Sequence, residues 1–261
     1  MKFLDLHSHV LKETYKKDYD KTLMDFISIK DAYSLNIALD LKTSKEVISL
    51  SKKYPNHFKA AIGIHPTSDN KNYLSDLEEI KQLYKDNKEQ VIAIGEPGLN
   101  FIGDYDKDLQ IKSLIAHLEL AYELDLPIIL HIREAATEVI EILKDIKKRP
   151  IIILHSWTGS VDQTKKLLEL DCYFSYSGIV TFKNAKHVFD SMMITPIEKM
   201  FYETDCPWLS PEPKRGKQNI PEYSLYVAEF IANKKNLSIN EFNNIIKLNF
   251  ENIFKVKNWV K

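Results

Sequence analysis

Residues of the kinds that bind divalent metals occur where five short apolar segments of this sequence end. Each segment is bounded by a histidine, a glutamate or an aspartate at its carboxyl end. The residues are His7, His9, Glu96, His131, His155 and Asp205. Four imidazoles and two carboxylates suit Zn, Mn, Ni or Co, or Mg if water completes the coordination shell. The set therefore predicts a metal centre that performs hydrolytic chemistry.

Six ligands exceed what one catalytic ion with open coordination positions needs. Two divalent ions roughly 3.5–4 Å apart, bridged by a carboxylate and a hydroxide, fit the set better. A single histidine at a strand end is more often a structural residue than a ligand. Five separate segments that each end in a ligand-type residue favour the metal centre over that alternative.

Two neighbouring segments show how the chain can position these side chains. Residues 127–133 and 150–156 are apolar, rich in β-branched residues and begin with proline, which is typical of buried strands. Residues 137–148 between them carry apolar side chains at helical spacing. A strand–helix–strand unit makes the strands parallel and places His131 and His155 on the same rim.

The rest of the chain repeats this unit. The expected strands are residues 3–9, 36–41, 58–66, 91–96, 127–133, 150–156, 172–179 and 200–205. The expected helices are residues 44–54, 73–87, 107–124, 137–148, 161–170 and 185–191, with two or three more after Pro221. Eight such units predict an α/β fold, a (β/α)8 TIM barrel, as a single domain over residues 1–261. An open doubly wound sheet is the alternative, which the absence of a G-x-G-x-x-G motif disfavours.

Composition limits the function classes. Hydrophobic residues make up 44% of the chain, charged residues 28%, and the formal net charge is −1, which argues against binding nucleic acid by bulk charge. Cys172 and Cys206 are too few for a disulfide framework, so we expect a cytoplasmic protein. The first residues do not form a signal peptide, and no apolar stretch is long enough to span a membrane. No obligate protein partner is evident.

Six motifs of the chain resemble the TatD family of metal-dependent hydrolases. They are His7-Ser8-His9, Gly63-Ile64-His65-Pro66, Gly95-Glu96-x-Gly98-Leu99, His131-x-Arg133-Glu134-Ala135, His155-x-x-x-Gly159-Ser160 and Glu203-Thr204-Asp205-x-Pro207-x-Leu209. The segment Arg215-Gly216-Lys217-x-Asn219-x-Pro221 is also similar to that family. The motifs cover almost the whole chain in the family's order.

The resemblance implies a barrel of the amidohydrolase superfamily with deoxyribonuclease activity. It implies that His7, His9 and Asp205 hold one metal, that His131 and His155 hold the second, and that Glu96 bridges them. Glu96 and Asp205 would be the catalytic residues, and a hydroxide activated by the two metals would attack the phosphodiester. The expected substrate is DNA, as single strands or frayed ends.

Four features depart from the family pattern. Asn100 stands where the family usually has aspartate, Pro97 follows the proposed bridging glutamate, and Ile132 follows His131 in place of serine. The segment Val10 to Tyr19 is also unlike the family. None of these changes removes a proposed ligand. Asn100 removes a carboxylate beside the metal rim, which leaves the metal preference open.

Other residues near the predicted rim could bind substrate. Arg133 could clamp a phosphate bidentately or form an ion pair at the barrel mouth. His65 could contact the scissile phosphate or simply pack before Pro66. Lys214, Arg215 and Lys217 form a basic loop that could bind phosphates, although exposed loops are often basic.

Aromatic residues and the remaining histidines leave alternatives open. Trp157 and Trp208 could stack on bases or pack against the rim. Glu203 is expected to orient a ligand rather than bind metal. The histidines outside the strand-end set are expected to be structural or surface residues; they are His57, His117 and His187.

Two functions compete with a nuclease. The same metals could cleave an ester, amide or phosphoester of a small molecule. A non-catalytic metal-binding scaffold is the second alternative, which the complete ligand set disfavours.

Overall fold

The chain forms a barrel of eight parallel strands in sequence order. The computed structural model describes residues 1–257 and 259–260. The strands are β1 (Phe3–Ser8), β2 (Ala32–Ile37), β3 (Phe58–Ile62), β4 (Val91–Asn100), β5 (Ile128–Arg133), β6 (Ile152–Leu154), β7 (Tyr173–Tyr176) and β8 (Met200–Tyr202). Each pairs in parallel with the next, from β1 to β8. This order confirms the predicted (β/α)8 fold.

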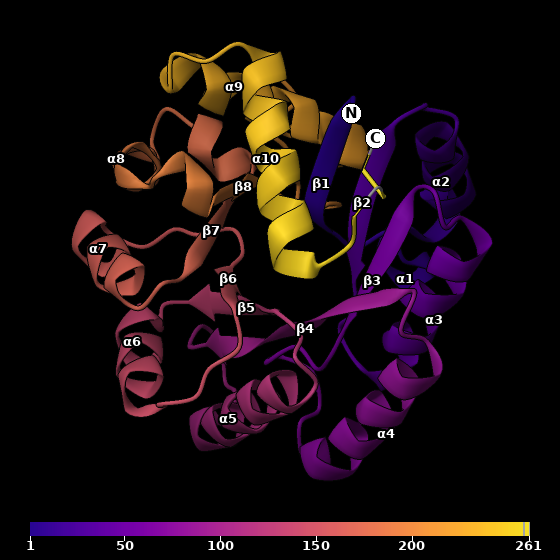
Figure 1. Ribbon diagram of the computed structural model, residues 1–261, viewed down its shortest axis with the longest axis vertical. Helices are drawn as coiled ribbons and strands as arrows, with labels where there is room; N and C mark the ends of the chain where they lie inside the picture. Colours follow the sequence, from indigo (N-terminus) through magenta and orange to yellow (C-terminus); the bar gives the residue numbers. More distant parts are fainter. Residues whose placement is uncertain (258, 261) are drawn as a thin grey trace.

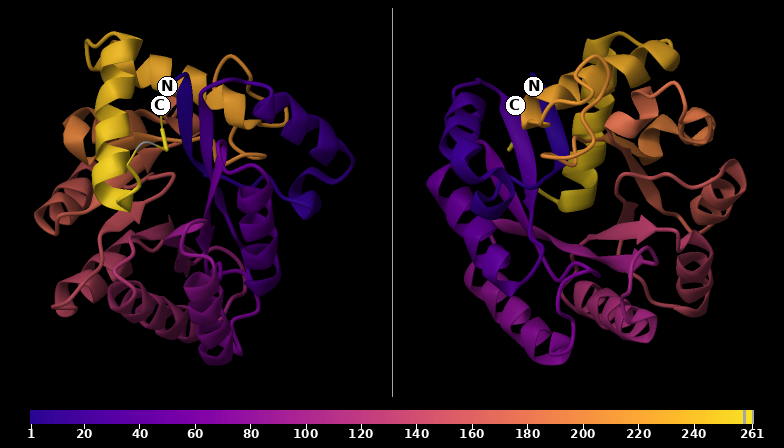
Figure 2. Two further views of the ribbon diagram at one scale, coloured as in Figure 1. Left: turned by 45° about the vertical axis from the view of Figure 1, so that its right-hand side comes forward. Right: turned by 180° about the vertical axis from the view of Figure 1, so that it is seen from behind.

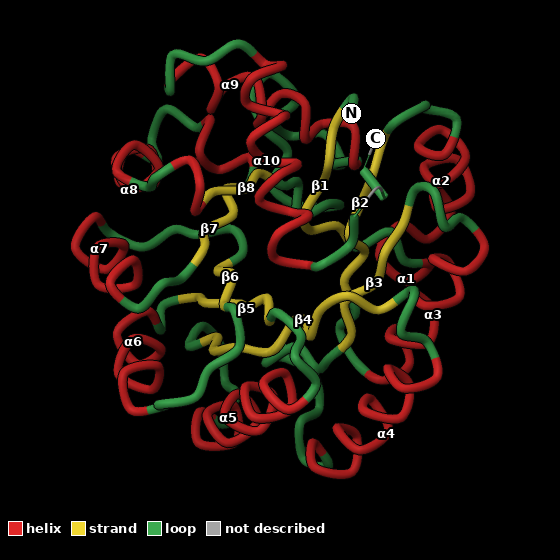
Figure 3. Tube along the Cα trace, in the orientation of Figure 1, coloured by secondary structure: helices red, strands yellow, loops and turns green. Residues whose placement is uncertain are grey.

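Helices surround the strands. They are α1 (Lys12–Tyr15), α2 (Tyr19–Ile27), α3 (Leu41–Lys53), α4 (Tyr73–Asp86), α5 (Lys107–Glu123), α6 (Ala136–Asp145), α7 (Val161–Glu169), α8 (Lys186–Ile194), α9 (Ser224–Lys234) and α10 (Ile239–Phe254). The strands follow one another round the middle of Figure 1, with α3 to α8 on the outside. Figure 3 shows the same two layers coloured by element type, and Figure 2 shows them from two further sides.

The layers follow from where the apolar residues fall. Strand β5 begins with three buried residues, Ile128 to Leu130. They are buried because helices cover the outer face of the barrel and side chains of the strands fill its interior. Helix α6 buries Val139, Ile140 and Leu143, which lie on one face at helical spacing. Because the helix packs on the sheet through that face, β5 and β6 are parallel and end on the same rim.

The seam between β8 and β1 is joined by a mixture of backbone and side-chain bonds. Near the carboxyl ends, the amide of Asp205 donates to the carbonyl of His7 at 2.9 Å, and Ser8 forms an isolated parallel β-bridge with Cys206. Lower down, the hydroxyl of Tyr202 accepts from the amide of Leu4 at 3.0 Å, a bond that the neighbouring backbone would otherwise make.

Buried Asp5 holds the same seam. Its carboxyl group accepts hydrogen bonds from both the amide, at 2.9 Å, and the hydroxyl of Thr204. Burial raises the pKa of Asp5 well above its usual value, and the two bonds from Thr204 oppose that shift. The contact ties the start of the first strand to the segment that carries Asp205.

The predicted position of the second strand was wrong. The strand is Ala32–Ile37, not residues 36–41. The pairing of Phe3 with Ala32 and Ser34 with Phe58 fixes it, because both neighbours hydrogen-bond to it there. The residues after it turn into α3, whose N-cap Asp40 accepts from the amide of Thr43 at 2.7 Å, so the helix also begins earlier than predicted.

Strand ends differ from prediction elsewhere. β7 and β8 are shorter than predicted, because Gly178–Thr181 forms a 3₁₀ turn and the chain after Tyr202 leaves the ladder. β4 is longer and continues to Asn100. Its extension requires Gly98, because a Cβ there would lie 1.9 Å from the carbonyl oxygen of His131. This close approach holds the end of β4 against β5.

The first loop contains helices that the sequence did not predict. α1 and α2 follow β1, and α2 buries Tyr19, Thr22, Leu23 and Phe26 against a second, smaller core cluster. Phe26 packs on Phe58 of β3 with ring centroids 4.9 Å apart. In the described part of the chain, no helix combines the length and apolar character needed to cross a membrane.

His117 of α5 is a structural histidine, as predicted. Its Nδ1 donates to the carbonyl of Ser113 at 2.7 Å, so its Nε2 can accept from the amide of Ile64 at 3.2 Å. Burial lowers the pKa of His117 to about 4. The folded protein therefore holds the imidazole neutral.

The linked prediction is a loss of stability in acid. The pKa of His117 in the folded state lies below the unfolded value of about 6.5. Its contribution to the free energy of unfolding is therefore complete above pH 6.5 and is lost as the pH falls towards 4. We expect roughly 3 kcal/mol to be lost over that window. Urea unfolding of the protein and of His117→Gln between pH 4 and 7 measures this. A stability difference that stays constant over that window would contradict it.

Candidate metal centre

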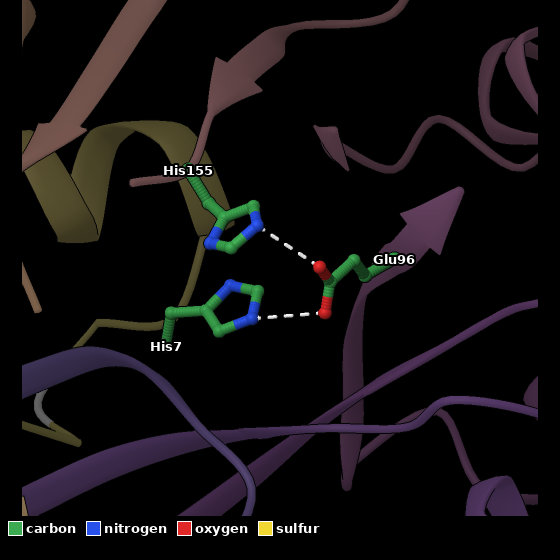
Figure 4. Close-up of side chains that lie close together, drawn as sticks. All are labelled: His7, Glu96 and His155. Atoms are coloured by element: carbon green, nitrogen blue, oxygen red, sulfur yellow. Dashed lines mark hydrogen bonds and ion pairs between the residues drawn. The ribbon is translucent and has the colours of Figure 1, made fainter. Parts of the chain in front are cut away.

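The structure brings all six predicted ligands together at the carboxyl end of the barrel. His7 Nε2 lies 3.0 Å from Glu96 Oε2, and His155 Nε2 lies 2.9 Å from Glu96 Oε1. Figure 4 shows the two imidazole rings stacked on each other, each facing one oxygen of the carboxylate. The other three side chains complete the cluster; they are His9, His131 and Asp205.

Glu96 divides the cluster into two halves. Its Oε2 faces His7 and His9, at 3.0 and 3.3 Å. Its Oε1 faces His131 and His155, at 3.0 and 2.9 Å. Asp205 belongs to the first half, because its Oδ1 lies 3.5 Å from His9 Nε2. A carboxylate placed in this way can bridge two cations.

The donor atoms fit a divalent metal. The facing imidazole nitrogens lie 3.1 Å apart in the pair His7–His9 and 3.3 Å apart in the pair His131–His155. Two nitrogen lone pairs at that separation repel each other unless a proton or a cation lies between them. Three overlapping groups of side chains could each hold one ion; they are His7–Glu96–His155, His7–His9–Asp205 and His65–Glu96–His131.

Hydrogen bonds on the outer side fix two of the imidazoles. His9 Nδ1 donates to the carbonyl of Ile37 at 3.0 Å, and His155 Nδ1 donates to Glu203 at 3.2 Å. In the neutral rings Nε2 then carries the lone pair, which is the form that binds metal. His7 differs, because its buried Nδ1 has no hydrogen-bond partner among the described residues.

His131 is fixed through Asn100. The side-chain nitrogen Nδ2 of Asn100 donates to the carbonyl of Ile102 at 2.6 Å, so the side-chain oxygen Oδ1 faces His131 Nε2 at 3.2 Å. His131 must therefore donate from Nε2, which leaves the Nδ1 lone pair for the metal. Asn100 is itself held by the side chain of Gln110, which accepts a hydrogen bond from the backbone N–H of Asn100 and donates one to its backbone carbonyl. Asn100, where the family usually has aspartate, thus orients His131 through a neutral acceptor.

Buried charges set the pKa values of the cluster. Burial disfavours ionised Glu96, but His155 and His7 outweigh it and hold the pKa of Glu96 well below its usual range. Burial likewise opposes protonation of His9, but Asp205 and Glu96 raise its pKa to about 9. Burial and the neighbouring charge of His155 lower the pKa of His7. Burial also opposes protonation of His155, but Glu96 and Glu203 raise its pKa well above the usual value. The buried carboxylates therefore favour positive charge on the imidazoles beside them, as they would favour a bound cation.

His65 lies beside the cluster as a neutral donor. The amide of Thr67 donates to His65 Nδ1 at 3.2 Å, so the proton of the neutral ring is on Nε2, which lies 3.6 Å from Glu96 Oε1. Burial lowers the pKa of His65 to about 3, so the ring stays neutral at physiological pH. Its Nε2 faces Glu96, and the side chain lines the cavity beside the cluster.

The cluster opens into a cavity of about 450 Å³. Arg133 lines it and is exposed, and no described carboxylate forms an ion pair with it. Within the described residues, the ion pair at the barrel mouth considered for Arg133 is therefore not formed. The remaining lining side chains outside the cluster are Leu39, His65, Thr67, Ser68, Trp208 and Leu209.

The basic loop lies outside this cavity. Arg215 packs its guanidinium 4.2 Å from the ring centroid of Phe182, and Lys214 lies 5.5 Å from the ring of Tyr223. Lys217 is exposed. Neither Arg215 nor Lys217 lines the metal cavity, so direct contact with the scissile group is not supported and binding to flanking phosphates remains the prediction.

The two tryptophans have different roles. Trp157 is 2% exposed and its indole N–H donates to Thr164 and Ser191, so it is part of the core. Trp208 is 48% exposed and lines the cavity. Of the remaining histidines, His57 donates to the carbonyl of Ala32 and His187 is exposed on α8.

Sequence reasoning missed the contributions of Asn100, Thr67 and Gln110. The sequence indicates only that a carboxylate is lost at residue 100, whereas in the structure Asn100 orients His131. Gln110 lies on α5 and reaches Asn100 only in the folded chain. The short spacing from His65 to Thr67 was the one available signal, because residues two apart in a turn can share a hydrogen bond.

A parallel barrel with a cluster of histidines and carboxylates at its carboxyl end defines a class of barrel hydrolases that depend on metals. Comparisons with known proteins agree. The sequence model of the family described as TatD related DNase matches residues 4–255. Among curated relatives, metal-dependent hydrolase YabD of Bacillus subtilis is 35% identical, with 97% of this chain and 98% of the relative covered. A Mycoplasma genitalium metal-dependent hydrolase, MG009, is also 35% identical, over 97% of this chain and 99% of the relative.

A solved structure gives the same result. The TatD homologue YjjV of Escherichia coli superposes with a TM-score of 0.88 at 25% identity, with 98% of each chain covered. The chain therefore belongs to the family of TatD-related DNases. It is a metal-dependent hydrolase of that family.

The contact between Glu203 and His155 generates a prediction. Glu203→Gln can still accept from His155 Nδ1 but removes the charge that makes the imidazole a stronger donor to metal. We expect metal affinity to fall by roughly 10-fold to 100-fold, with an unchanged fold. Titration with Zn²⁺ and Mn²⁺ against a competing chelator measures this. Glu138→Gln, on an exposed turn of α6, is the control. Unchanged metal affinity in Glu203→Gln would show that Glu203 does not influence metal binding.

Proposed function

We propose that this hydrolase cleaves phosphodiester bonds of DNA, in single strands or frayed ends, in the cytoplasm and without an obligate protein partner. The observation that carries the proposal is the position of Glu96 between two pairs of imidazoles, beside a cavity lined by Arg133, which forms no ion pair with any described residue. Two divalent ions bound there would lower the pKa of a water molecule and stabilise charge on phosphoryl oxygens. Zn, Mg, Mn, Ni and Co all suit these donors.

The proposed ligands act through the geometry described above. His7, His9 and Asp205 would hold one ion, His131 and His155 the other, and Glu96 would join them. The outer hydrogen bonds keep the imidazole lone pairs aimed inward, so little reorganisation accompanies binding.

Asp205 is the proposed proton acceptor. Its contacts with the cluster use Oδ1, and its side chain is 14% exposed towards the cavity. Oδ2 can then accept a hydrogen bond from the attacking water, orient it, and pass the proton to the leaving oxygen. The backbone bonds of Asp205 to His7 and Trp208 hold it in this position.

Substrate phosphates would meet two donors. Arg133 can clamp phosphate oxygens with two parallel hydrogen bonds because no described carboxylate competes for it. The N–H of His65 can donate to a phosphoryl oxygen without adding charge. The family's description as DNases supports a nucleic acid substrate.

A small-molecule ester, amide or phosphoester is the second candidate substrate. It is favoured by the size of the cavity, about 450 Å³, which matches sites for small ligands, and by the position of Arg215 and Lys217 outside it. Assay of a short single-stranded oligonucleotide beside a panel of small esters separates the two. Hydrolysis of small esters with every oligonucleotide left intact would overturn the proposed DNase activity.

Asp205 and Glu96 should differ when their charge is removed. Asp205→Asn should lower kcat roughly 100-fold or more and keep metal at the His131–His155 position, because only the base is lost. Glu96→Gln should lower the occupancy of both metals together with kcat, because the bridge is lost. Metal content and kcat measured side by side test this. Near-normal kcat in Asp205→Asn with full metal would rule out the proton-transfer role.

Arg133 is tested by comparing substrates. Arg133→Ala should raise KM for oligonucleotides about 10-fold and affect a minimal aryl phosphodiester less, because only the longer substrate has flanking phosphates. The loss should depend only modestly on salt, since few phosphates are neutralised. Arg149→Ala is the matched control, because Arg149 lies before β6 at the opposite end of the barrel. Equal losses on both substrates would argue against contact with flanking phosphates.

A further inference from the structure

Trp208 presents an exposed aromatic face at the mouth of the metal cavity. It lies three residues after Asp205, and its side chain is 48% exposed. Other large apolar side chains in the described residues are as exposed, including Tyr105 and Tyr122, but Trp208 alone among them lines this cavity. Burial of an indole stabilises a protein strongly, and an exposed indole does not contribute that energy. The exposed position of Trp208 therefore needs an explanation, either a ligand that covers the ring or a packing role.

The backbone that carries Trp208 is rigidly held. Asn219, which is fully buried, donates from its side chain to the carbonyls of Trp208 and Thr204 at 2.5 and 2.9 Å. The amide of Trp208 donates to the carbonyl of Asp205 at 3.1 Å. The loop therefore fixes the Cα of Trp208 relative to the metal cluster while its side chain stays exposed.

The contacts of the indole leave one face free. Its ring meets the ring of His9 edge to face, with centroids 5.4 Å apart and planes at 64°. Its N–H has no hydrogen-bond acceptor among the described residues. Trp157, by contrast, is buried with its N–H doubly bonded, which is how a structural tryptophan of this chain is held. Packing therefore does not account for the exposed face of Trp208.

We propose that Trp208 is a base-stacking residue, on which the nucleobase next to the scissile phosphate lies. This inference rests on the proposed function. Stacking on an indole is possible for every base, so it selects unpaired nucleotides without selecting sequence. A base within a duplex is already stacked and paired, so the same face would favour single strands and frayed ends. Trp208 would thus determine strand form, while the metal cluster performs the chemistry.

The test combines variants with substrates that lack one base. The wild-type protein, Trp208→Ala and Trp208→Phe are assayed on a single-stranded hexanucleotide and on a series in which one tetrahydrofuran abasic residue moves along it. Trp208→Ala should raise KM about 10-fold with little change in kcat, and Trp208→Phe should raise it less. For the wild-type protein, an abasic residue at one position of the hexanucleotide should raise KM by a similar factor. For Trp208→Ala, the same abasic residue should cause no further rise in KM.

Controls separate stacking from structure. Tyr122→Ala, at an equally exposed position near the end of α5, should leave KM unchanged. Metal content and thermal unfolding of Trp208→Ala should match those of the wild type. If Trp208→Ala raises KM equally on intact and abasic oligonucleotides, or if the wild type is indifferent to every abasic position, stacking is overturned while the nuclease stands. A wild-type protein that cleaves no oligonucleotide overturns the proposed function and this inference together.

Discussion

The whole site depends on the closure of the barrel between β8 and β1. His7 and His9 come from the start of the chain and Asp205 from a position about 200 residues later, and only the seam places them side by side. The last strands are short, so little backbone ladder is available there. The carboxyl group of Asp5 and the hydroxyl of Tyr202 provide the missing bonds. A loss of these contacts would disturb the metal cluster before it disturbed the rest of the core.

Glu96 is the electrostatic centre of the closed barrel. A buried carboxylate costs several kcal/mol unless opposite charge compensates it. Five imidazoles face Glu96 at 2.9 to 3.6 Å, those of His65 and of the four histidines in the cluster. Protons on the cluster histidines can compensate the charge of Glu96, but the facing nitrogens are better satisfied by cations. The same arrangement therefore favours the binding of a cation at this position. Metal binding and stability are linked, because an ion that binds only the folded state shifts the folding equilibrium towards it.

The two halves of the cluster are oriented by different acceptors. His155 donates to the carboxylate of Glu203, His9 to a backbone carbonyl, and His131 to the neutral side chain of Asn100. A charged acceptor makes an imidazole a stronger metal ligand than a neutral one does. The half of the site that contains His131 therefore combines one strongly and one weakly polarised ligand.

Local patterns in the sequence are enough to predict the barrel and the six side chains that meet in the cluster. Apolar runs alternating with helical spacing are local patterns, and a ligand at a strand end needs only the parallel fold to reach the common rim. Tertiary structure alone decided the start of β2, because the pairing of neighbouring strands fixes it. It also decided that Trp157 is core and Trp208 is exposed, and that Asn100 faces His131. Each of these depends on contacts between segments far apart in sequence, whose distances and burial no local pattern encodes.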